Sequence, residues 1–154
     1  ALADALSPAP WTPAQQTAAE RALALYAGRF LGSDDEHPWQ LVQRERLASK
    51  YRRVVRAVVA EACARGDAAL ARRTIERALE LDPLDEDLQR DMLQLLADAG
   101  EHGAALARYE RWRALCAKTL GIEPAAATQA LAAVIRAAAG TPRDGANVRR
   151  QPTP

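Results

Sequence analysis

The chain has 154 residues, which fits one domain with short tails, and 49% of them are apolar, enough for a core. Its formal net charge of +1 is too near neutral to indicate nucleic-acid binding by itself. No apolar run reaches about 18 residues, and no basic start precedes an apolar stretch at the N-terminus, so we expect no membrane span, no secretion signal and a cytoplasmic location.

The first predicted elements are a lead-in, a helix and a loop. Residues 1–13 are rich in proline and predicted to be a linker or partly ordered lead-in. Thr12 and Pro13 suit the start of a helix that runs to about Tyr26. Its predicted buried residues are Ala18, Ala22, Leu25 and Tyr26. Glycines and acidic residues then predict a loop, within which we expect Phe30 and Leu31 to contact the core.

A long helix is predicted from about Pro38 to Arg65, because apolar residues recur there with helical spacing. Its predicted apolar stripe consists of Trp39, Val42, Leu47, Tyr51, Val54, Val55, Val58, Val59 and Ala62. The aromatic residues Trp39, Tyr51, Tyr109 and Trp112 fit core packing better than a ligand-binding aromatic box, because their spacing is helical.

A repeat follows this helix. Residues 62–73 and 96–107 align at a spacing of 34, which places Gly66 on Gly100. The same shift places Ala71 on Ala105, Ile75 on Tyr109 and Ala78 on Trp112. A period of 34 with a helix on each side of the glycine is typical of tetratricopeptide repeats, and alanines at the crossings allow close helix packing. Chance similarity within an alanine-rich helical protein is the alternative interpretation.

Four more helices complete the predicted fold. The first is capped by Asp67 and ends at Asp82-Pro83. Asp85 or Asp87 caps the next, which Gly100 closes with a left-handed turn. A third runs from about Gly103 to Leu120, and Gly121 closes it. The last begins at Pro124 and ends at Gly140. The residues predicted to face inward are Leu70, Ala71, Thr74, Ile75, Ala78 and Leu79, then Leu88, Met92, Leu95, Leu96 and Ala99, then Leu106, Tyr109, Trp112 and Cys116, then Leu131, Val134, Ile135 and Ala138.

The predicted fold class is therefore all-α, a tetratricopeptide-like solenoid of helical hairpins with about six to seven helices. Residues 14–139 form the predicted domain, and residues 140–154, with prolines, three arginines and no apolar period, are a predicted disordered tail. The chain begins with Ala1, and its single methionine is Met92, so we expect a fragment or a processed form.

No residue pattern indicates catalysis. The sequence has no glycine-rich phosphate loop, no nucleophile paired with a base and no cluster of metal ligands. Cys63 and Cys116 are predicted to be buried, reduced thiols, and His37 and His102 lie apart in predicted loops. We therefore expect a non-enzyme with no cofactor, no metal and no catalytic residues.

Charged residues form two patches of opposite sign. The long helix carries a basic strip whose members share one helix face: Arg46, Lys50 and Arg53. This strip is either a docking site for an acidic partner or nucleic-acid phosphate, or an ordinary solvated face. An acidic patch comprises Glu80, Asp82, Asp85, Glu86, Asp87 and Asp91. Capping explains several of these carboxylates, and head-to-tail association with the basic strip is the other hypothesis.

Several motifs occur in the order typical of one family. They occupy residues 26–31, an acidic loop, residues 38–39, 44–47 and 78–86, then Tyr109 with Arg113, and residues 120–124 with Thr128. Over about residues 14–139 the chain resembles the bacterial transcriptional activator domain, the tetratricopeptide-like domain of regulators of the antibiotic-pathway activator (SARP) type. In that family the domain follows a winged-helix DNA-binding domain, and the present sequence contains no strand-rich segment of that kind.

The resemblance implies a regulatory, non-catalytic role in oligomerisation, signal relay or protein contact. The expected partners are other domains of the same regulator, a second copy or the transcription machinery, with DNA bound only by a separate domain. In tetratricopeptide proteins the first helix of each repeat lines the inner groove, which would place there Arg53, Arg56, Arg90 and Gln94. Ala60 stands where the version of the repeat that binds peptide tails has asparagine. The alternative function is a free-standing adaptor that binds a peptide or a small acidic ligand in this groove.

Overall fold

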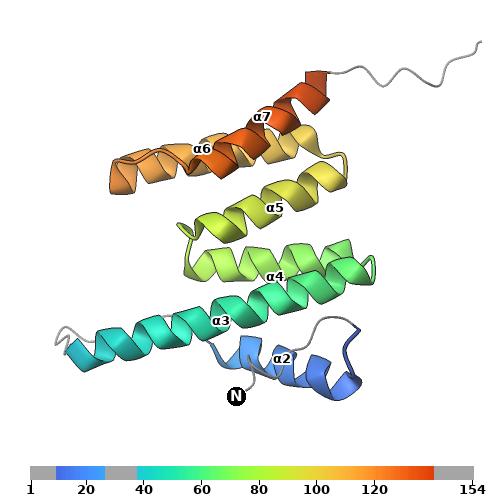
Figure 1. Ribbon diagram of the computed structural model, residues 1–154, viewed down its shortest axis with the longest axis vertical. Helices are drawn as coiled ribbons and strands as arrows, with labels where there is room; N and C mark the ends of the chain where they lie inside the picture. Colours follow the sequence, from blue (N-terminus) through green and yellow to red (C-terminus); the bar gives the residue numbers. More distant parts are fainter. Residues whose placement is uncertain (1–9, 27–37, 141–154) are drawn as a thin grey trace, which may run out of the picture.

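The computed structural model describes residues 10–26 and 38–140, which form a stack of six helices and no strand (Figure 1). In chain order these are α2 (Pro13–Leu25), α3 (Pro38–Ala64), α4 (Ala68–Leu81), α5 (Glu86–Asp98), α6 (His102–Leu120) and α7 (Ala126–Gly140). The fold is all-α and built from helical hairpins, as predicted. The expectations for the lead-in before residue 10, for Phe30, Leu31 and His37, for the side chain of Trp39 and for the tail after Gly140 lie outside the described residues.

The repeat of 34 residues is present in the backbone. Gly66 and Gly100 have positive φ values of 73° and 77°, which favour glycine because it has no Cβ. The hydrogen bonds around them also repeat: Gly66 N–H donates to Cys63 and Asp67 N–H to Ala62, as Gly100 N–H donates to Ala97 and Glu101 N–H to Leu96. Hairpin α3–α4 and hairpin α5–α6 are therefore two copies of one unit.

The packing inside the two hairpins repeats as well. Ala71 and its counterpart Ala105 are both fully buried, and the pairs Ile75 with Tyr109 and Ala78 with Trp112 are buried too. Each helix packs against the next in the chain from α3 onward, α2 packs against α3, and α5 also contacts α7. The core joins all these layers, with Val55, Ile75, Leu88, Met92, Leu93, Tyr109 and Ile135 among its buried residues. The matching burial at these three pairs of positions argues against chance similarity as the explanation.

Local signals set most helix ends as predicted, but His102, predicted to lie in a loop, is the first residue of α6. The Thr12 hydroxyl accepts the Gln15 N–H in a capping box, with Pro13 in the first turn. Asp67 and Asp85 accept the N–H groups of Leu70 and Leu88. The last helix starts at Ala126 rather than Pro124, because the Ala125 N–H and the Thr128 hydroxyl both donate to one Glu86 oxygen, each at 2.7 Å. This carboxylate ties α7 to α5.

Several predicted inward faces were wrong. In α2, Leu25 is 84% exposed, whereas Ala19 is buried and Leu23 packs with it against α3. In α3, Val42 and Leu47 are exposed because they lie in the part of the helix that α4 does not reach. In α5, Ala99 is exposed and Leu93 takes an inward position.

The last helix shows the largest error. Val134 and Ala138 are exposed, and Thr128, Ala132 and Ile135 face the core instead. Apolar residues occupy nearly all sides of α7, so periodicity could not identify its inner face.

Candidate functional site

The first half of α3 projects beyond the stack (Figure 1). With 27 residues α3 is roughly 40 Å long, whereas α4 has 14 residues and is roughly 21 Å long. Over its second half α3 is covered by α2 and α4, and Val55 is 0% exposed. In the projecting half Leu41 is 44% and Val42 50% exposed. The apolar stripe of α3, which packs against other helices in its second half, is therefore exposed to solvent in the projecting half.

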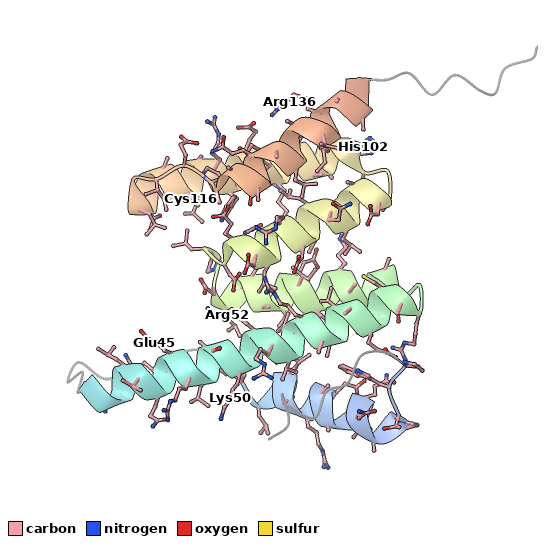
Figure 2. The ribbon with its side chains drawn as sticks, in the orientation of Figure 1. Glu45, Lys50, Arg52, His102, Cys116 and Arg136 are labelled. Carbon is pink, nitrogen blue, oxygen red and sulfur yellow. The ribbon has the colours of Figure 1, made fainter. Side chains whose placement is uncertain are left out.

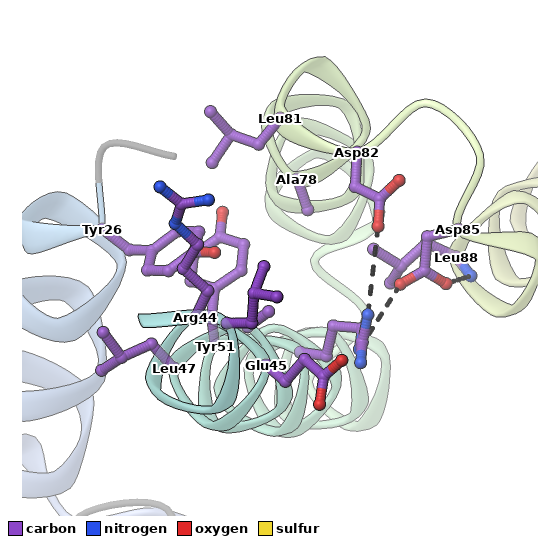
Figure 3. A pocket seen from close by; sticks show the side chains of 13 residues that line it. Tyr26, Arg44, Glu45, Leu47, Tyr51, Ala78, Leu81, Asp82, Asp85 and Leu88 are labelled. Atoms are coloured by element: carbon purple, nitrogen blue, oxygen red, sulfur yellow. Dashed lines mark hydrogen bonds and ion pairs between the residues drawn. The ribbon is translucent and has the colours of Figure 1, made fainter. Parts of the chain in front are cut away.

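A cleft of about 470 Å³ lies where this projecting half meets the ends of α2 and α4 (Figure 3). Its lining includes Leu41, Leu47 and Ala48 from α3 and Leu81 from α4. Such walls are mainly apolar and fit a partner's apolar side chains.

The rings of Tyr26 and Tyr51 stack in this cleft, with centroids 4.1 Å apart and an interplanar angle of 17°. Burial raises the pKa of Tyr51, while the nearby Arg77 partly opposes the shift. The two stacked rings add apolar, aromatic surface to the cleft.

One end of the cleft is bounded by charges. The Arg52 guanidinium lies 3.9 Å from Asp82 and 3.8 Å from Asp85 (Figure 3). Asp85 is at the same time the N-cap of α5, and its side chain is largely buried. Arg52 therefore links α3 by ion pairs to the turn between α4 and α5.

A second ion-pair group joins α3 to α5. The Asp87 carboxylate accepts Arg56 at 2.6 Å and Arg90 at 2.7 Å, and Arg56 also lies 4.0 Å from Asp91. Partial burial acts to raise the pKa of Asp87, but the two guanidinium groups together outweigh it and lower the pKa. Burial raises the pKa of Asp91 despite the same two arginines.

The acidic patch is thus largely paired within the chain. Asp82, Asp85, Asp87 and Asp91 contact arginines, and Glu86 binds the start of α7. Head-to-tail association through this patch would have to compete with these contacts inside the chain.

The basic strip lies on a different side of α3. Arg52 lies on the side of α3 that faces α4 and α5, and Lys50 lies on the opposite side of the helix (Figure 2). Arg46, Lys50 and Arg53 are all exposed. Among residues 10–26 and 38–140, Arg46 and Lys50 belong to no ion pair, in contrast to Arg52 and Arg56, which pair with carboxylates of the acidic patch.

The family model of the bacterial transcriptional activator domain matches residues 3–136. The chain belongs to this family. No curated protein and no solved structure matches the chain significantly. The bacterial transcriptional activator domain is a domain of transcriptional regulators rather than an enzyme family, which agrees with the predicted resemblance.

Within this activator domain, the structure brings together two of the four residues predicted for the groove. Arg56 and Arg90 meet at Asp87, as two first helices of adjacent repeats would. Gln94 donates to Asp98 at 2.7 Å. Arg53 is exposed on the side of the basic strip. An acidic ligand in this groove would compete with carboxylates that Arg56 and Arg90 already bind.

The cysteine prediction is half wrong for this activator domain. Cys116 is buried as predicted, but Cys63 is exposed. Partial burial raises the pKa of the Cys63 thiol, and the nearby carboxylates of Asp98 and Asp91 add to the shift, so Cys63 is not an activated nucleophile. Cys63 is a small residue in the last turn of α3, and nothing in the sequence around it indicated that its side chain would be exposed.

Sequence reasoning also missed the cleft. Leu41, Leu81 and the Tyr26–Tyr51 stack come from three helices, and only the fold brings them together. The available signal was length, because a helix predicted over residues 38–65 cannot be covered along its whole length by one predicted over residues 68–82.

Two further observations concern residues 10–26 and 38–140. None of their helices combines the length and apolarity that crossing a membrane requires. They also contain no group of three histidine, cysteine or acidic side chains that could hold a metal ion.

Proposed function

We propose that the chain is the regulatory, protein-contacting domain of a bacterial transcriptional regulator, acting in the cytoplasm and without catalysis. The observation that carries the proposal is the family match over residues 3–136. In this proposal DNA is bound by a separate winged-helix domain of the regulator, and the present domain relays a signal to it by contact.

The projecting half of α3 is the proposed contact surface. Leu41 and Leu47 with Leu81 offer apolar area beside the cleft, and the Arg52 ion pairs hold the cleft's far end in place. Exposed apolar groups flanked by fixed charges are typical of protein interfaces. Arg46 and Lys50 of the basic strip lie in the same half of the helix, Arg53 follows just beyond it, and together they would attract an acidic segment of the partner.

A binding assay between the purified chain and the winged-helix domain of its regulator tests the proposal. Leu47→Ser should weaken binding by about tenfold or more, because it removes apolar contact area from the interface. Leu115→Ser on α6 is the matched control, since Leu115 is 37% exposed and Leu47 36%. Equal affinities for wild type and Leu47→Ser, or no binding at any concentration, would refute the proposed contact.

Fluorescence anisotropy with promoter DNA tests whether the basic strip binds DNA directly rather than an acidic segment of a protein partner. We expect the chain by itself to show only weak, salt-sensitive binding that does not distinguish sequences. Sequence-specific binding that Lys50→Glu abolishes would instead place DNA recognition on α3.

The alternative is a free-standing adaptor with a peptide or small acidic ligand in its groove. It has less support, because Asp87 and Asp91 already engage the guanidinium groups of Arg56 and Arg90. A rise in melting temperature with an acidic peptide, lost in Arg90→Gln, would favour the adaptor.

A further inference from the structure

Arg108 of α6 is held in one orientation by a chain of two hydrogen bonds. Its Nε donates to the side-chain oxygen of Gln89 on α5 at 3.0 Å, and the amide nitrogen of Gln89 donates to the carbonyl oxygen of Pro83 at 3.1 Å. Gln89 is buried, with 7% of its surface exposed. Because the oxygen and the nitrogen of its amide are both bonded, Gln89 cannot turn without losing a hydrogen bond. The guanidinium of Arg108 is therefore anchored to α5 and to the turn between α4 and α5.

Arg108 differs from the exposed arginines in its pairing. Arg52, Arg56, Arg113 and Arg136 are exposed, and each forms an ion pair with a carboxylate. Arg108 is half-buried, yet within the described part of the chain it belongs to no ion pair, and its two terminal nitrogens donate to no protein group. A charge removed from water normally has a partner, because burying it unpaired is costly. The terminal nitrogens of Arg108 thus remain able to donate to an anion.

The charges around Arg108 leave a surplus of one positive unit. Arg111 lies one turn further along the same side of α6 and also belongs to no ion pair among the residues that the structure describes. Arg72 of α4 donates to Glu76 at 3.3 Å and to Glu101, the N-cap of α6, at 3.2 Å. Burial lowers the pKa of Arg108, Glu76 opposes this shift, and Arg111 and Arg72 add to it. Three arginines thus face two glutamates, both of which Arg72 already engages.

We propose that the terminal nitrogens of Arg108 bind a carboxylate that is carried by an acidic segment of a partner protein. Because Gln89 occupies Nε, the other two nitrogens form the fork that matches two carboxylate oxygens in one plane. A surplus of one positive charge matches a carboxylate better than a phosphate group, which carries roughly two negative charges. Arg111 would bind a second acidic residue of the same segment.

A polypeptide segment fits this site better than a free small acid. Arg111 is exposed, so the positive charge continues from the half-buried Arg108 onto the open surface of α6. A free monocarboxylate would contact one guanidinium only, and a single charge-assisted pair is too weak for more than about millimolar affinity. A segment with two acidic residues gains a second pair without a second loss of translational freedom.

An NMR titration of the chain with an oligo-aspartate peptide tests the site directly. The Nε–H group of Arg108 should give a resolved signal, because its hydrogen bond to Gln89 slows exchange with water. We expect this signal to shift and to saturate as peptide is added. The Nε–H group of Arg113, which donates to Glu110 at 3.1 Å, is the internal reference and should not move. No shift at Arg108 up to about millimolar peptide, or equal shifts at both arginines, would overturn the proposal.

Two substitutions separate oriented binding from simple charge attraction. Arg108→Lys keeps the charge but loses the planar fork, so the dissociation constant, followed at the backbone amide of Arg111, should rise about tenfold or more. Arg73→Gln is the charge control, since Arg73 is an exposed arginine of α4 that forms no ion pair within the described residues, and should change the constant by less than about twofold. Wild-type affinity in Arg108→Lys, or equal losses in both variants, would mean that only net charge matters and would overturn the proposal.

Gln89 is the positioning residue of this site. Gln89→Met removes the acceptor of the Arg108 Nε–H group and leaves the charge of Arg108 in place. The Arg108 signal should then broaden through faster exchange, and the dissociation constant should rise by about fivefold, because the fork is no longer held in one orientation. Unchanged affinity in Gln89→Met would contradict a site that depends on this orientation.

Acetate and inorganic phosphate, each added at the ionic strength of the peptide titration, identify the source of the anion. Acetate should shift the Arg108 signal without saturating it, since acetate makes one pair only. Saturation by acetate as tight as by the peptide would indicate a free small acid as ligand, and tighter saturation by phosphate would indicate a phosphate ligand. Either result would overturn the proposal. Because Arg108 lies on α6, none of these results changes the expected binding of the winged-helix domain through α3.

Discussion

The two hairpins are alike where they pack and different where they project. Around Gly66 and Gly100 the backbone hydrogen bonds coincide after a shift of 34 residues, and the buried alanines at the crossings coincide too. However, α3 has 27 residues and α5 has 13. The additional length is the half of α3 that forms the cleft and carries most of the basic strip. The repeat thus carries the buried helix crossings, and the part outside the repeat carries the cleft and is the proposed contact surface.

The largest expected effect is at the repeated alanines. Ala71→Trp and Ala105→Trp should each destabilise the fold by about 1–3 kcal/mol or more, because both sites are fully buried and an indole must push the paired helices apart. Urea unfolding measures both. Ala104→Trp, at an exposed position of α6, is the control. If both buried variants kept the wild-type stability, the hairpins would not pack at these alanines.

Substitutions at the two hairpin turns should destabilise the fold by similar amounts, and by less than the tryptophan substitutions. Gly66→Ala and Gly100→Ala should each cost about 1–2 kcal/mol, since alanine is disfavoured at positive φ. A Cβ at Gly66 would meet no atom within 4 Å, so the cost there arises from backbone strain and not from a clash. Thermal unfolding of both variants provides the comparison. A large difference between the two costs would mean that the turns are not equivalent.

The ion pairs between the hairpins should contribute a smaller, pH-dependent stability. Because the fold lowers the pKa of Asp87, its ionised form stabilises above the unfolded carboxyl pKa of about 4, and this contribution is lost as pH falls through the folded pKa. Asp87→Asn should therefore cost under about 1 kcal/mol at neutral pH, since the pair is exposed.

Thermal unfolding at several pH values measures this difference. The gap between wild type and Asp87→Asn should close below about pH 4 and shrink at high salt. Glu80→Gln, an exposed carboxylate outside these pairs, should show no gap. A gap for Asp87→Asn that persists in acid would contradict the assignment of the pKa shift to Arg56 and Arg90.

The smallest stability effect belongs to the projecting half of α3. Val42→Ser should change the free energy of unfolding by no more than about 0.5 kcal/mol, because half of this side chain is already in water. A cost comparable with that at Ala71 would mean that the projecting half is part of the core.

The sequence predicted well whatever depends on neighbours along the chain. Thr12, Asp67 and Asp85 cap helices through bonds to residues three positions away, and the glycine turns depend on local φ. Amphipathic α4 and α5 also showed most of their buried faces. Periodicity was ineffective in α7 and α2, where alanine on several sides leaves no single apolar face, so Val134 and Leu25 were placed wrongly.

The candidate sites depended on contacts between distant segments. The contact between Arg56 and Asp87 forms because the fold brings the side chains of α3 and α5 together. The cleft exists because α4 is too short to cover the first half of α3. The sequence predicted basic residues on α3 and acidic residues around α5. It could not predict which of them pair, because the pairing depends on how the helices pack against each other.

Hydrogen exchange of the chain, with and without the winged-helix domain of its regulator, tests the central claim most directly. The account predicts slower exchange on binding in residues 38–50 and in the turn at residues 81–85, with little change at the buried crossings around Ala71 and Ala105. Protection confined to the outer faces of α4 and α6, with none in the projecting half of α3, would contradict it.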